Sequence, residues 1–256
     1  MAERLIVYVD GFNLYHGLHD SARCRWLWLD LVALATSLRP RSALQQVRYF
    51  TAPVLGQPDA QSRQQHYLDA LVAHNGARID IVQGRYQSKT KTCRTCGAQW
   101  VEREEKETDV NIAVGLVTDT ARGAMDAALL LSADSDLAPA VRAAKGINPS
   151  LFVAAAFPPK RYSAELKALM PASFQISPSK VRGSFLPETS KRQAAHSIVR
   201  RSGARRGAVP APRQTGPKSA FLRRAVVTDG QLAIGMRIIS RSTSSGSRRM
   251  TRGPLR

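Results

Sequence analysis

The sequence predicts an α/β domain in which a central, mainly parallel sheet is flanked by helices. Short apolar runs alternate along the chain with segments of helical periodicity, and this alternation is typical of βαβ units. The runs at 4–9 and 127–132 are apolar at nearly every position, as expected of strands that are covered on both faces, whereas QVRYFT at 46–51 alternates. Gly11, Pro40 and Gly76 separate the segments and are residues that end or redirect regular elements.

Strands are predicted where short β-branched or aliphatic runs occur. The first reads RLIVYV and ends at Asp10-Gly11, as a buried strand should. A later run, AALLLS, is continuous and ends just before Asp134. The five predicted strands cover residues 4–9, 46–51, 78–84, 127–132 and 150–156. No internal repeat is visible among them.

Between these strands, apolar residues recur at helical spacing and predict helices. Residues 28–38 show it before Pro40, which cannot continue a helix. Residues 61–75 are amphipathic and are followed by Gly76, a common signal for the end of a helix. The pattern resumes at Thr108, and a further short helix is expected to end near Lys145.

The chain divides by composition into a domain and a tail. We predict one domain over residues 1–187, with a polar, cysteine-containing insertion at 88–106 that forms a loop or hairpin. Residues 188–256 are rich in Ser, Arg, Gly and Pro, and we predict a disordered, basic, low-complexity tail there.

The positive charge is concentrated in that tail. The whole chain carries a formal net charge of +19, and residues 181–256 alone hold 17 basic and 2 acidic residues. Such an extension favours phosphate-rich partners, chiefly RNA or DNA. A solvated tail without a specific role is the alternative.

The sequence gives no sign of a membrane or secreted protein. It contains no run of about 18 apolar residues, and its start leads directly into a strand pattern without the parts of a signal peptide. Three cysteines, two of them paired, argue against a disulfide framework and favour a reducing compartment. We therefore expect a cytoplasmic protein.

Four aspartates lie where the predicted elements leave the core. Asp10 follows the first strand, and Asp109 lies at the start of a helix. Asp134 and Asp136 follow the strand at 127–132. Ligands of open parallel sheets bind outside the carboxyl ends of the strands, so we expect these carboxylates to converge at one edge.

Crowded carboxylates repel one another unless a cation compensates them. Hard oxygen ligands suit Mg²⁺ or Mn²⁺, and such ions support phosphodiester hydrolysis by polarising a phosphoryl oxygen and lowering the pKa of bound water. Helix capping is the competing interpretation for single residues, and both Asp109 and Asp136 fit it.

Three polar neighbours of these acids are further candidates. Asn13 could orient a phosphate or a carboxylate through its amide, and the hydroxyls of Ser132 and Thr108 could do the same. Turn and cap roles are the alternative for both hydroxyls. Gly11 permits a tight turn from strand to helix.

Three segments around these acids read VDGFNLYHG at 9–17, KETDVNIAVGLVTD at 106–119 and LLLSADSDLAPAV at 129–141. They resemble the successive motifs of NYN-domain proteins, a family of PIN-like nucleases, in their LabA-like branch. FPPKRYSAELKALMPASFQIS at 157–177 is similar to the C-terminal end of that group. The resemblance covers roughly residues 4–186.

The resemblance implies a PIN-like (Rossmannoid) domain that binds Mg²⁺ or Mn²⁺ and, in active members, cleaves RNA to leave a 5′-phosphate. Asp10 matches the acid of the first strand, and Asn13 matches the asparagine of the name-giving pattern. Asp109 matches the acid of the mid-chain helix. Asp134 and Asp136 match the two acids of the Ser-Ala-Asp-Ser-Asp motif, and the metal ligands implied are Asp10, Asp109 and Asp134.

The segment CRTCG at 93–97 has the spacing of half a zinc site. Structural zinc usually takes four Cys or His ligands, and Cys93 with Cys96 supplies two. Cys24, His16 and His19 are the other candidates, but their positions argue for no particular pairing. A site shared across a homodimer is one arrangement, and a surface loop with two unpaired thiols is the alternative.

Basic side chains near the acids are predicted phosphate contacts. Arg85 lies at the insertion, and Lys160 and Arg161 follow a proline pair. They could line the path of a nucleic-acid backbone, although charged residues are also common on solvated faces.

A metal-dependent ribonuclease is the leading functional hypothesis. The alternative is a non-catalytic RNA-binding or regulatory module that keeps the fold. A small-molecule phosphohydrolase is a weaker hypothesis, because the sequence after Asp10 lacks the second acid that aspartyl-phosphate enzymes carry two residues on.

Overall fold

The computed structural model describes residues 2–189, without the side chains of Cys24 and of residues 102–105. The predicted tail therefore lies almost wholly outside the described residues. None of the described helices combines the length and the apolar composition needed to cross a bilayer.

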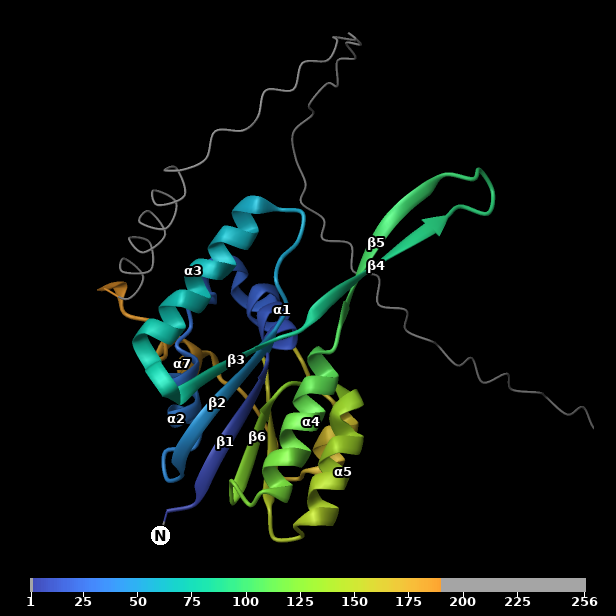
Figure 1. Cartoon of the computed structure of the whole chain (residues 1–256). Helices are drawn as coiled ribbons and strands as arrows, with labels where there is room; N and C mark the ends of the chain where they lie inside the picture. Colours follow the sequence, from blue (N-terminus) through green and yellow to red (C-terminus); the bar gives the residue numbers. More distant parts are fainter. Residues whose placement is uncertain (1, 190–256) are drawn as a thin grey trace, which may run out of the picture. The chain divides into compact units, whose positions relative to one another are not determined.

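The centre of the domain is a sheet of six strands in the order β3-β2-β1-β6-β7-β8 (Figure 1). Every neighbouring pair in it is parallel. The strands are β1 (Arg4–Asp10), β2 (Ala43–Thr51), β3 (Ile79–Gln83), β6 (Ala127–Leu131), β7 (Phe152–Phe157) and β8 (Phe174–Gln175). The predicted α/β class with a mainly parallel sheet is confirmed.

The strand order reverses between β1 and β6. From β1 the chain winds outward through β2 to β3, then returns to the other side of β1 and winds outward again through β6, β7 and β8. Helices connect the strands along both courses. In sheets of this kind the crevice at the reversal point, outside the carboxyl ends of the strands, is where ligands bind.

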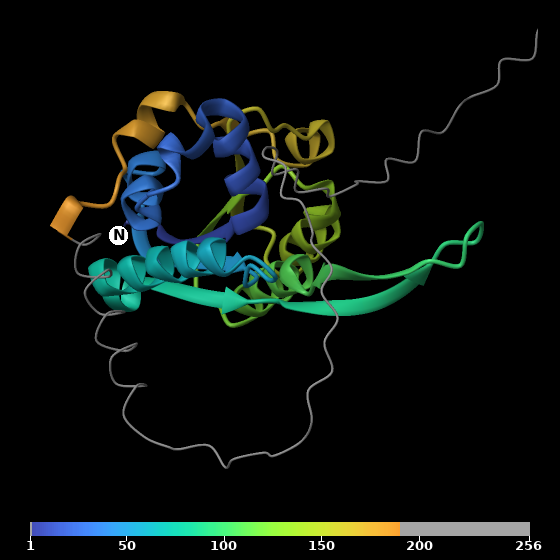
Figure 2. The ribbon, with the colours of Figure 1, turned by 90° about the horizontal axis from the view of Figure 1, so that it is seen from above.

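Helices cover both faces of the sheet, as the view from above shows (Figure 2). They are α1 (Gly11–Ala22), α2 (Leu31–Leu38), α3 (Pro58–Asn75), α4 (Thr108–Ala121), α5 (Ala138–Ile147), α6 (Ala164–Leu169) and α7 (Pro178–Arg182), with short 3-10 turns η1 (Arg23–Trp26), η2 (Gly76–Arg78) and η3 (Ser135–Leu137).

Side chains alternate between two apolar cores along each strand. In β1, Leu5, Val7 and Val9 enter the core beneath α1, α2 and α3. Ile6 and Tyr8 enter the core beneath α4, α5 and α6. Burial on both faces explains why β1 and β6 read as continuous apolar runs, whereas β2 and β3, which are only partly buried, include polar residues.

A buried polar group fixes α4 against the sheet. The Asp119 carboxylate accepts hydrogen bonds from the Tyr8 hydroxyl at 2.7 Å and from Arg48 at 2.9 Å. These contacts tie α4 to β1 and β2, so they also set where the first turn of α4 lies relative to the sheet edge. Burial, followed by the bond to Asp119, raises the pKa of Tyr8 well above its ordinary range.

The segment between β3 and α4 forms a separate two-stranded antiparallel sheet of β4 (Arg85–Thr92) and β5 (Gln99–Lys106). This hairpin projects away from the six-stranded sheet in both views (Figures 1 and 2). The cysteine pair lies in its turn.

Candidate metal centre

Asp10 is the last residue of β1 and is only 3% exposed. It also precedes α1, whose first free N–H groups need acceptors. Its Oδ1 accepts a hydrogen bond from the N–H of Asn13 at 3.0 Å, so Asp10 is the N-cap of α1. A single residue thus ends a buried strand, starts a helix and brings a carboxylate to the sheet edge.

Asp134 reaches the same edge from the neighbouring strand. Ser132 and Ala133 follow β6, and the Oδ1 of Asp134 then accepts a hydrogen bond from the N–H of Asp136 at 3.0 Å. Asp134 is therefore the N-cap of η3, and Asp136 lies inside that turn. The alternative interpretation of Asp136 as a helix cap is therefore wrong, because the chain turns two residues earlier.

Asp109 comes from the first turn of α4. Glu107, just before the helix, has a φ of 81°, a left-handed conformation that is rare for a residue with a side chain. This sharp turn separates β5 from α4 and makes Asp109 the second helical residue. The alternative interpretation of Asp109 as a helix cap is wrong, since the cap position belongs to Glu107, which makes no capping bond through its side chain.

The three carboxylates converge. Asp10, Asp109 and Asp134 each offer an oxygen, and these oxygens all lie within 4.8 Å of one another. In the part of the chain that the structure describes, no other group of three acidic, histidine or cysteine side chains comes together in this way. The group lies at the carboxyl ends of β1 and β6, where the strand order reverses.

Ser132 and Asn13 connect the two strand-borne acids. The hydroxyl of Ser132 donates to Oδ2 of Asp10 at 2.8 Å and accepts from the N–H of Asp134 at 3.0 Å. The side-chain oxygen of Asn13 accepts from the N–H of Ala133 at 3.1 Å. These bonds hold the end of β1 and the turn after β6 in one fixed arrangement.

The surroundings of Asp10 disfavour its charged form in the absence of a cation. Burial is the main cause that raises the pKa of Asp10 to about 6. The N–H of Asn13 and the hydroxyl of Ser132 oppose this shift, whereas the negative charge of Asp134 adds to it. A cation among the carboxylates would remove both the repulsion and part of the cost of burying the charge.

The residues present fit Mg²⁺ or Mn²⁺. The donors are all carboxylate oxygens, which hard divalent cations prefer over nitrogen and sulfur. Asp109 is exposed and Asp134 is half-buried, so water and a substrate phosphate can reach the same point. Mg²⁺ usually keeps several waters and binds few protein carboxylates, which matches an open group of three.

The other predicted site residues lie in several places. Thr108 is buried at the start of α4, beside Asp109. Arg85 forms an ion pair with Glu107 at the base of the hairpin. Arg161 forms an ion pair with Asp20 of α1 at 2.8 Å. Lys160, in the loop after β7, is exposed and has a φ of 63°.

Sequence patterns do not predict two of the residues near the site. Tyr49 of β2 lies beneath the start of α1, where a Cβ on Gly11 would be 3.1 Å from its hydroxyl oxygen. Burial raises the pKa of Tyr49 to about 12, and the charge of Asp10 adds to this shift. The other is Glu107, whose left-handed backbone conformation sets the direction in which α4 begins. Neither has a signal in the sequence, because one depends on strand register and the other on backbone conformation.

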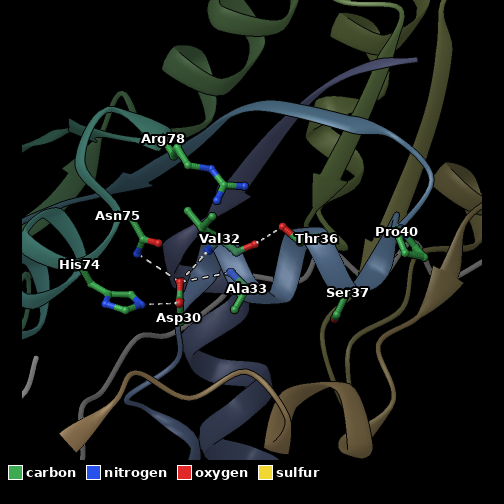
Figure 3. Close-up of a pocket in the computed structure, with 9 residues that line it drawn as sticks. All are labelled: Asp30, Val32, Ala33, Thr36, Ser37, Pro40, His74, Asn75 and Arg78. Atoms are coloured by element: carbon green, nitrogen blue, oxygen red, sulfur yellow. Dashed lines mark hydrogen bonds and ion pairs between the residues drawn. The ribbon is translucent and has the colours of Figure 1, made fainter. Parts of the chain in front are cut away.

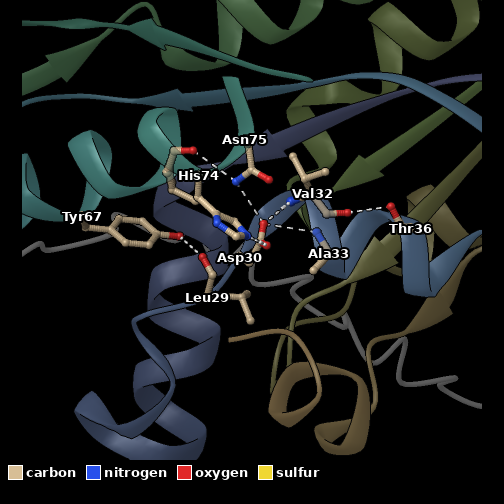
Figure 4. Close-up of polar contacts among 9 residues, drawn as sticks. Leu29, Asp30, Val32, Ala33, Thr36, Tyr67, His74 and Asn75 are labelled. Carbon is tan, nitrogen blue, oxygen red and sulfur yellow. Dashed lines mark hydrogen bonds and ion pairs between the residues drawn. The ribbon is translucent and has the colours of Figure 1, made fainter. Parts of the chain in front are cut away.

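A pocket of about 540 Å³ lies away from the acids, where β2 and β3 begin (Figure 3). Its polar centre is Asp30, the N-cap of α2, which accepts from the N–H groups of Val32 at 3.0 Å and Ala33 at 3.2 Å. Asn75 donates to the same carboxylate at 3.1 Å, and His74 lies 3.4 Å from it (Figure 4). Helix capping accounts for this group.

The match to known families agrees with this architecture. The family model for the NYN domain matches residues 4–172. The chain belongs to the NYN domain family, a branch of the PIN-like nucleases, as its motifs predict.

The individual proteins that the chain resembles share less than 30% of its residues. The chain is 28% identical over 172 residues to the 6-hydroxy-3-succinoylpyridine 3-monooxygenase HspA of Pseudomonas putida (strain DSM 28022 / S16), a match covering 54% of each protein. It thus spans about half the length of this curated relative. Among solved structures, it is similar to a protein of unknown function from Vibrio parahaemolyticus, with 17% identity, a TM-score of 0.49, and coverage of 72% of this chain and 97% of the other.

Proposed function

We propose that this protein is a metal-dependent ribonuclease that hydrolyses RNA phosphodiester bonds at Asp10, Asp109 and Asp134. The observation that carries the proposal is the convergence of three carboxylates, from three separate segments, within 4.8 Å at the reversal point of the sheet. Membership of the NYN family supports a nuclease in general. The choice of RNA rests on the family resemblance and on the basic charge of the chain.

The three aspartates would hold Mg²⁺ or Mn²⁺. When bound there, such a cation neutralises charge on the phosphoryl oxygens and lowers the pKa of a water molecule. Ser132 keeps Asp10 and Asp134 oriented through its two hydrogen bonds, and Asn13 holds the turn after β6. Asp136 has an exposed side chain near this group and contributes its N–H to Asp134.

Basic residues would receive the nucleic-acid backbone. Arg85 and Arg161 are held by Glu107 and Asp20 in ion pairs with exposed partners, and such pairs contribute little to stability. A phosphate can therefore replace the carboxylate partner at small cost. Lys160, next to Arg161, and Thr108, next to Asp109, complete the set of proposed substrate contacts.

The proposal is tested by cleavage of end-labelled, single-stranded RNA with Mn²⁺, Mg²⁺ or a chelator. Wild-type protein should cleave with the cation and not with the chelator, and Asp134→Asn should lower the rate by at least about 100-fold. Asp126→Asn is the matched control, because this aspartate pairs with Arg4 at the opposite ends of the strands. Equal rates for wild type and Asp134→Asn would overturn the proposal.

A non-catalytic RNA-binding module is the alternative, and the excess of 17 basic over 2 acidic residues in 181–256 favours it independently of the acids. This function predicts salt-dependent RNA binding with no cleavage in either cation. The monooxygenase activity in the name of the Pseudomonas putida relative is not transferred, since the match spans about half of that protein.

A further inference from the structure

The turn of the β4–β5 hairpin has the backbone arrangement that brings two thiols together. The N–H of Gly97 donates to the carbonyl of Cys93 at 2.9 Å, and the N–H of Cys93 donates to the carbonyl of Ala98 at 2.8 Å. Gly97 has a φ of 71°, a left-handed conformation that favours glycine. The chain therefore reverses within five residues, with one cysteine before the turn and one inside it.

The two thiols lie close to each other and to backbone donors. The N–H groups of Cys96 and Thr95 are directed at the sulfur of Cys93, and the thiol of Cys96 also contacts it. These donors, the N–H groups most strongly, lower the pKa of the Cys93 thiol. Cys93 is half-buried and Cys96 is exposed. Two free thiols that the turn brings together at the exposed end of the hairpin are suited to binding a soft or borderline cation such as Zn²⁺.

The hairpin itself cannot complete a zinc site. Structural zinc takes four ligands, and the hairpin from Arg85 to Val101 contains no His, Asp or Glu. Glu102 pairs with Lys89, three residue pairs below Thr92 and Gln99, which is about 10 Å along the strands. Among the described side chains, the only group able to surround a cation is the aspartate group at the sheet edge.

We propose that two copies of this chain join through their hairpin turns, with Cys93 and Cys96 of each copy holding one shared Zn²⁺. The hairpin projects from the sheet (Figures 1 and 2), so a second copy can reach its turn. Zinc with four thiolates carries a net charge of −2, and Arg94, between the two cysteines of each copy, supplies compensating positive charge. Trp100, 49% exposed and paired with Lys91 near the turn, offers apolar surface for the contact.

The test uses the full chain with a reductant and excess Mg²⁺, which occupies the carboxylate site. We expect about one zinc per two chains and a dimer by light scattering that returns to a 28.0 kDa monomer when zinc is removed. Co²⁺ in place of zinc should give the absorption bands of tetrahedral four-thiolate coordination. Cys93→Ser and Cys96→Ser should each abolish the zinc, the bands and the dimer.

Cys24→Ser is the matched control, since it removes a thiol that lies outside the hairpin, and it should leave all three readouts unchanged. One zinc per monomeric chain would overturn the proposal, because the site would then be complete within one copy. Absence of zinc in the wild type, or a dimer that survives both zinc removal and Cys93→Ser, would overturn it as well. None of these readouts depends on nuclease activity.

Discussion

Asp10 uses both carboxylate oxygens within the protein, one for the N–H of Asn13 and one for the hydroxyl of Ser132. These bonds do not offset the burial of its charge, so its pKa is raised from 3.8 to about 6. A residue kept only for stability would not carry a destabilising charge at neutral pH. Such a conflict is common at functional sites, where a charge is retained for its chemistry.

The pH dependence of stability follows from this shift. Because the pKa of Asp10 is higher in the folded protein, its favourable contribution is complete below about pH 4 and is lost as the pH rises through about 6. At pH 7.5 the ionised carboxylate costs about 3 kcal/mol, the equivalent of about two pKa units. Without divalent cations, Asp10→Asn should therefore raise the melting temperature by several degrees at pH 7.5.

At pH 4.5 the gain from Asp10→Asn should largely disappear, because the wild-type carboxylate is then protonated. Thermal unfolding of both proteins at the two pH values, with a chelator present, measures this difference. A variant that is less stable than the wild type at pH 7.5 would contradict the assignment of burial as the dominant effect on Asp10.

Ser132 is a positioning residue for two of the proposed ligands. Ser132→Ala removes the donor to Asp10 and the acceptor for the N–H of Asp134. Loss of such supporting bonds typically lowers metal affinity by about 10–100-fold. Calorimetric titration with Mn²⁺ should show this loss, whereas Ser135→Ala, which alters an exposed hydroxyl in the next turn, should bind as the wild type does.

The proposed ligands can be predicted from sequence because each lies where an apolar run ends or a helix begins. The hydrogen bonds of these ligands cannot be predicted in this way. The link from Ser132 to Asp10 spans 122 positions in the chain and exists only because β1 and β6 are neighbours. The alternative capping roles of Asp109 and Asp136 are wrong for a related reason, since small shifts in where a turn begins decide which residue caps it.

At the level of elements, α1 is held at the sheet edge by close backbone contacts. A Cβ on Gly11 would be 2.5 Å from the carbonyl oxygen of Phe50, at the end of β2. A Cβ on Gly17 would be 2.7 Å from the carbonyl oxygen of Pro159, in the loop after β7. Two glycines thus allow α1, which carries Asn13, to approach both neighbouring segments.

Replacing a helical glycine by alanine should have opposite effects at two positions. Gly17→Ala places a methyl group against backbone, so it should destabilise the protein by about 1–3 kcal/mol. Gly146→Ala, in α5, meets nothing within 4 Å and should stabilise by up to about 1 kcal/mol. Denaturant unfolding of the two variants gives both values, and a stabilising Gly17→Ala would show that α1 does not pack as described.

Most elements can be predicted because their apolar patterns are strong. The strands at residues 4–9 and 127–132 correspond to β1 and β6 within one residue. The turn at Gly11 indicates that a helix follows, but the extent of α1 is not evident from the sequence, because GFNLYHGLHDSA contains two glycines, which weaken a helical pattern. Strand β8 has only two residues, and its pairing with β7 defines it, so no local pattern can reveal it.

Across the whole molecule, an acidic centre and a strongly basic sequence occur in one chain. Residues 1–180 are nearly balanced, with 21 basic and 17 acidic residues, while 181–256 hold 17 and 2. The acids are suited to a cation, and the basic segment is suited to a phosphate backbone. Composition predicts this division of charge, but not which segment of RNA would enter the site.

Removal of residues 190–256 should weaken RNA binding and reduce its salt dependence. Each phosphate that the protein no longer neutralises lowers the slope of log K against log salt by about 0.7 for a single strand, so a decrease of at least about 2 is expected. Fluorescence anisotropy over a range of salt concentrations measures this slope. An unchanged slope would show that the RNA-binding charge lies within the domain.

The central claim is that Asp10, Asp109 and Asp134 together hold one divalent cation. Calorimetric titration with Mn²⁺ tests it most directly, using wild type, the three single Asp→Asn variants and Asp126→Asn as the control. We expect one site in wild type and in the control, and a loss of at least about 10-fold in affinity in each of the three variants. Binding as tight as wild type in all three variants would contradict the claim.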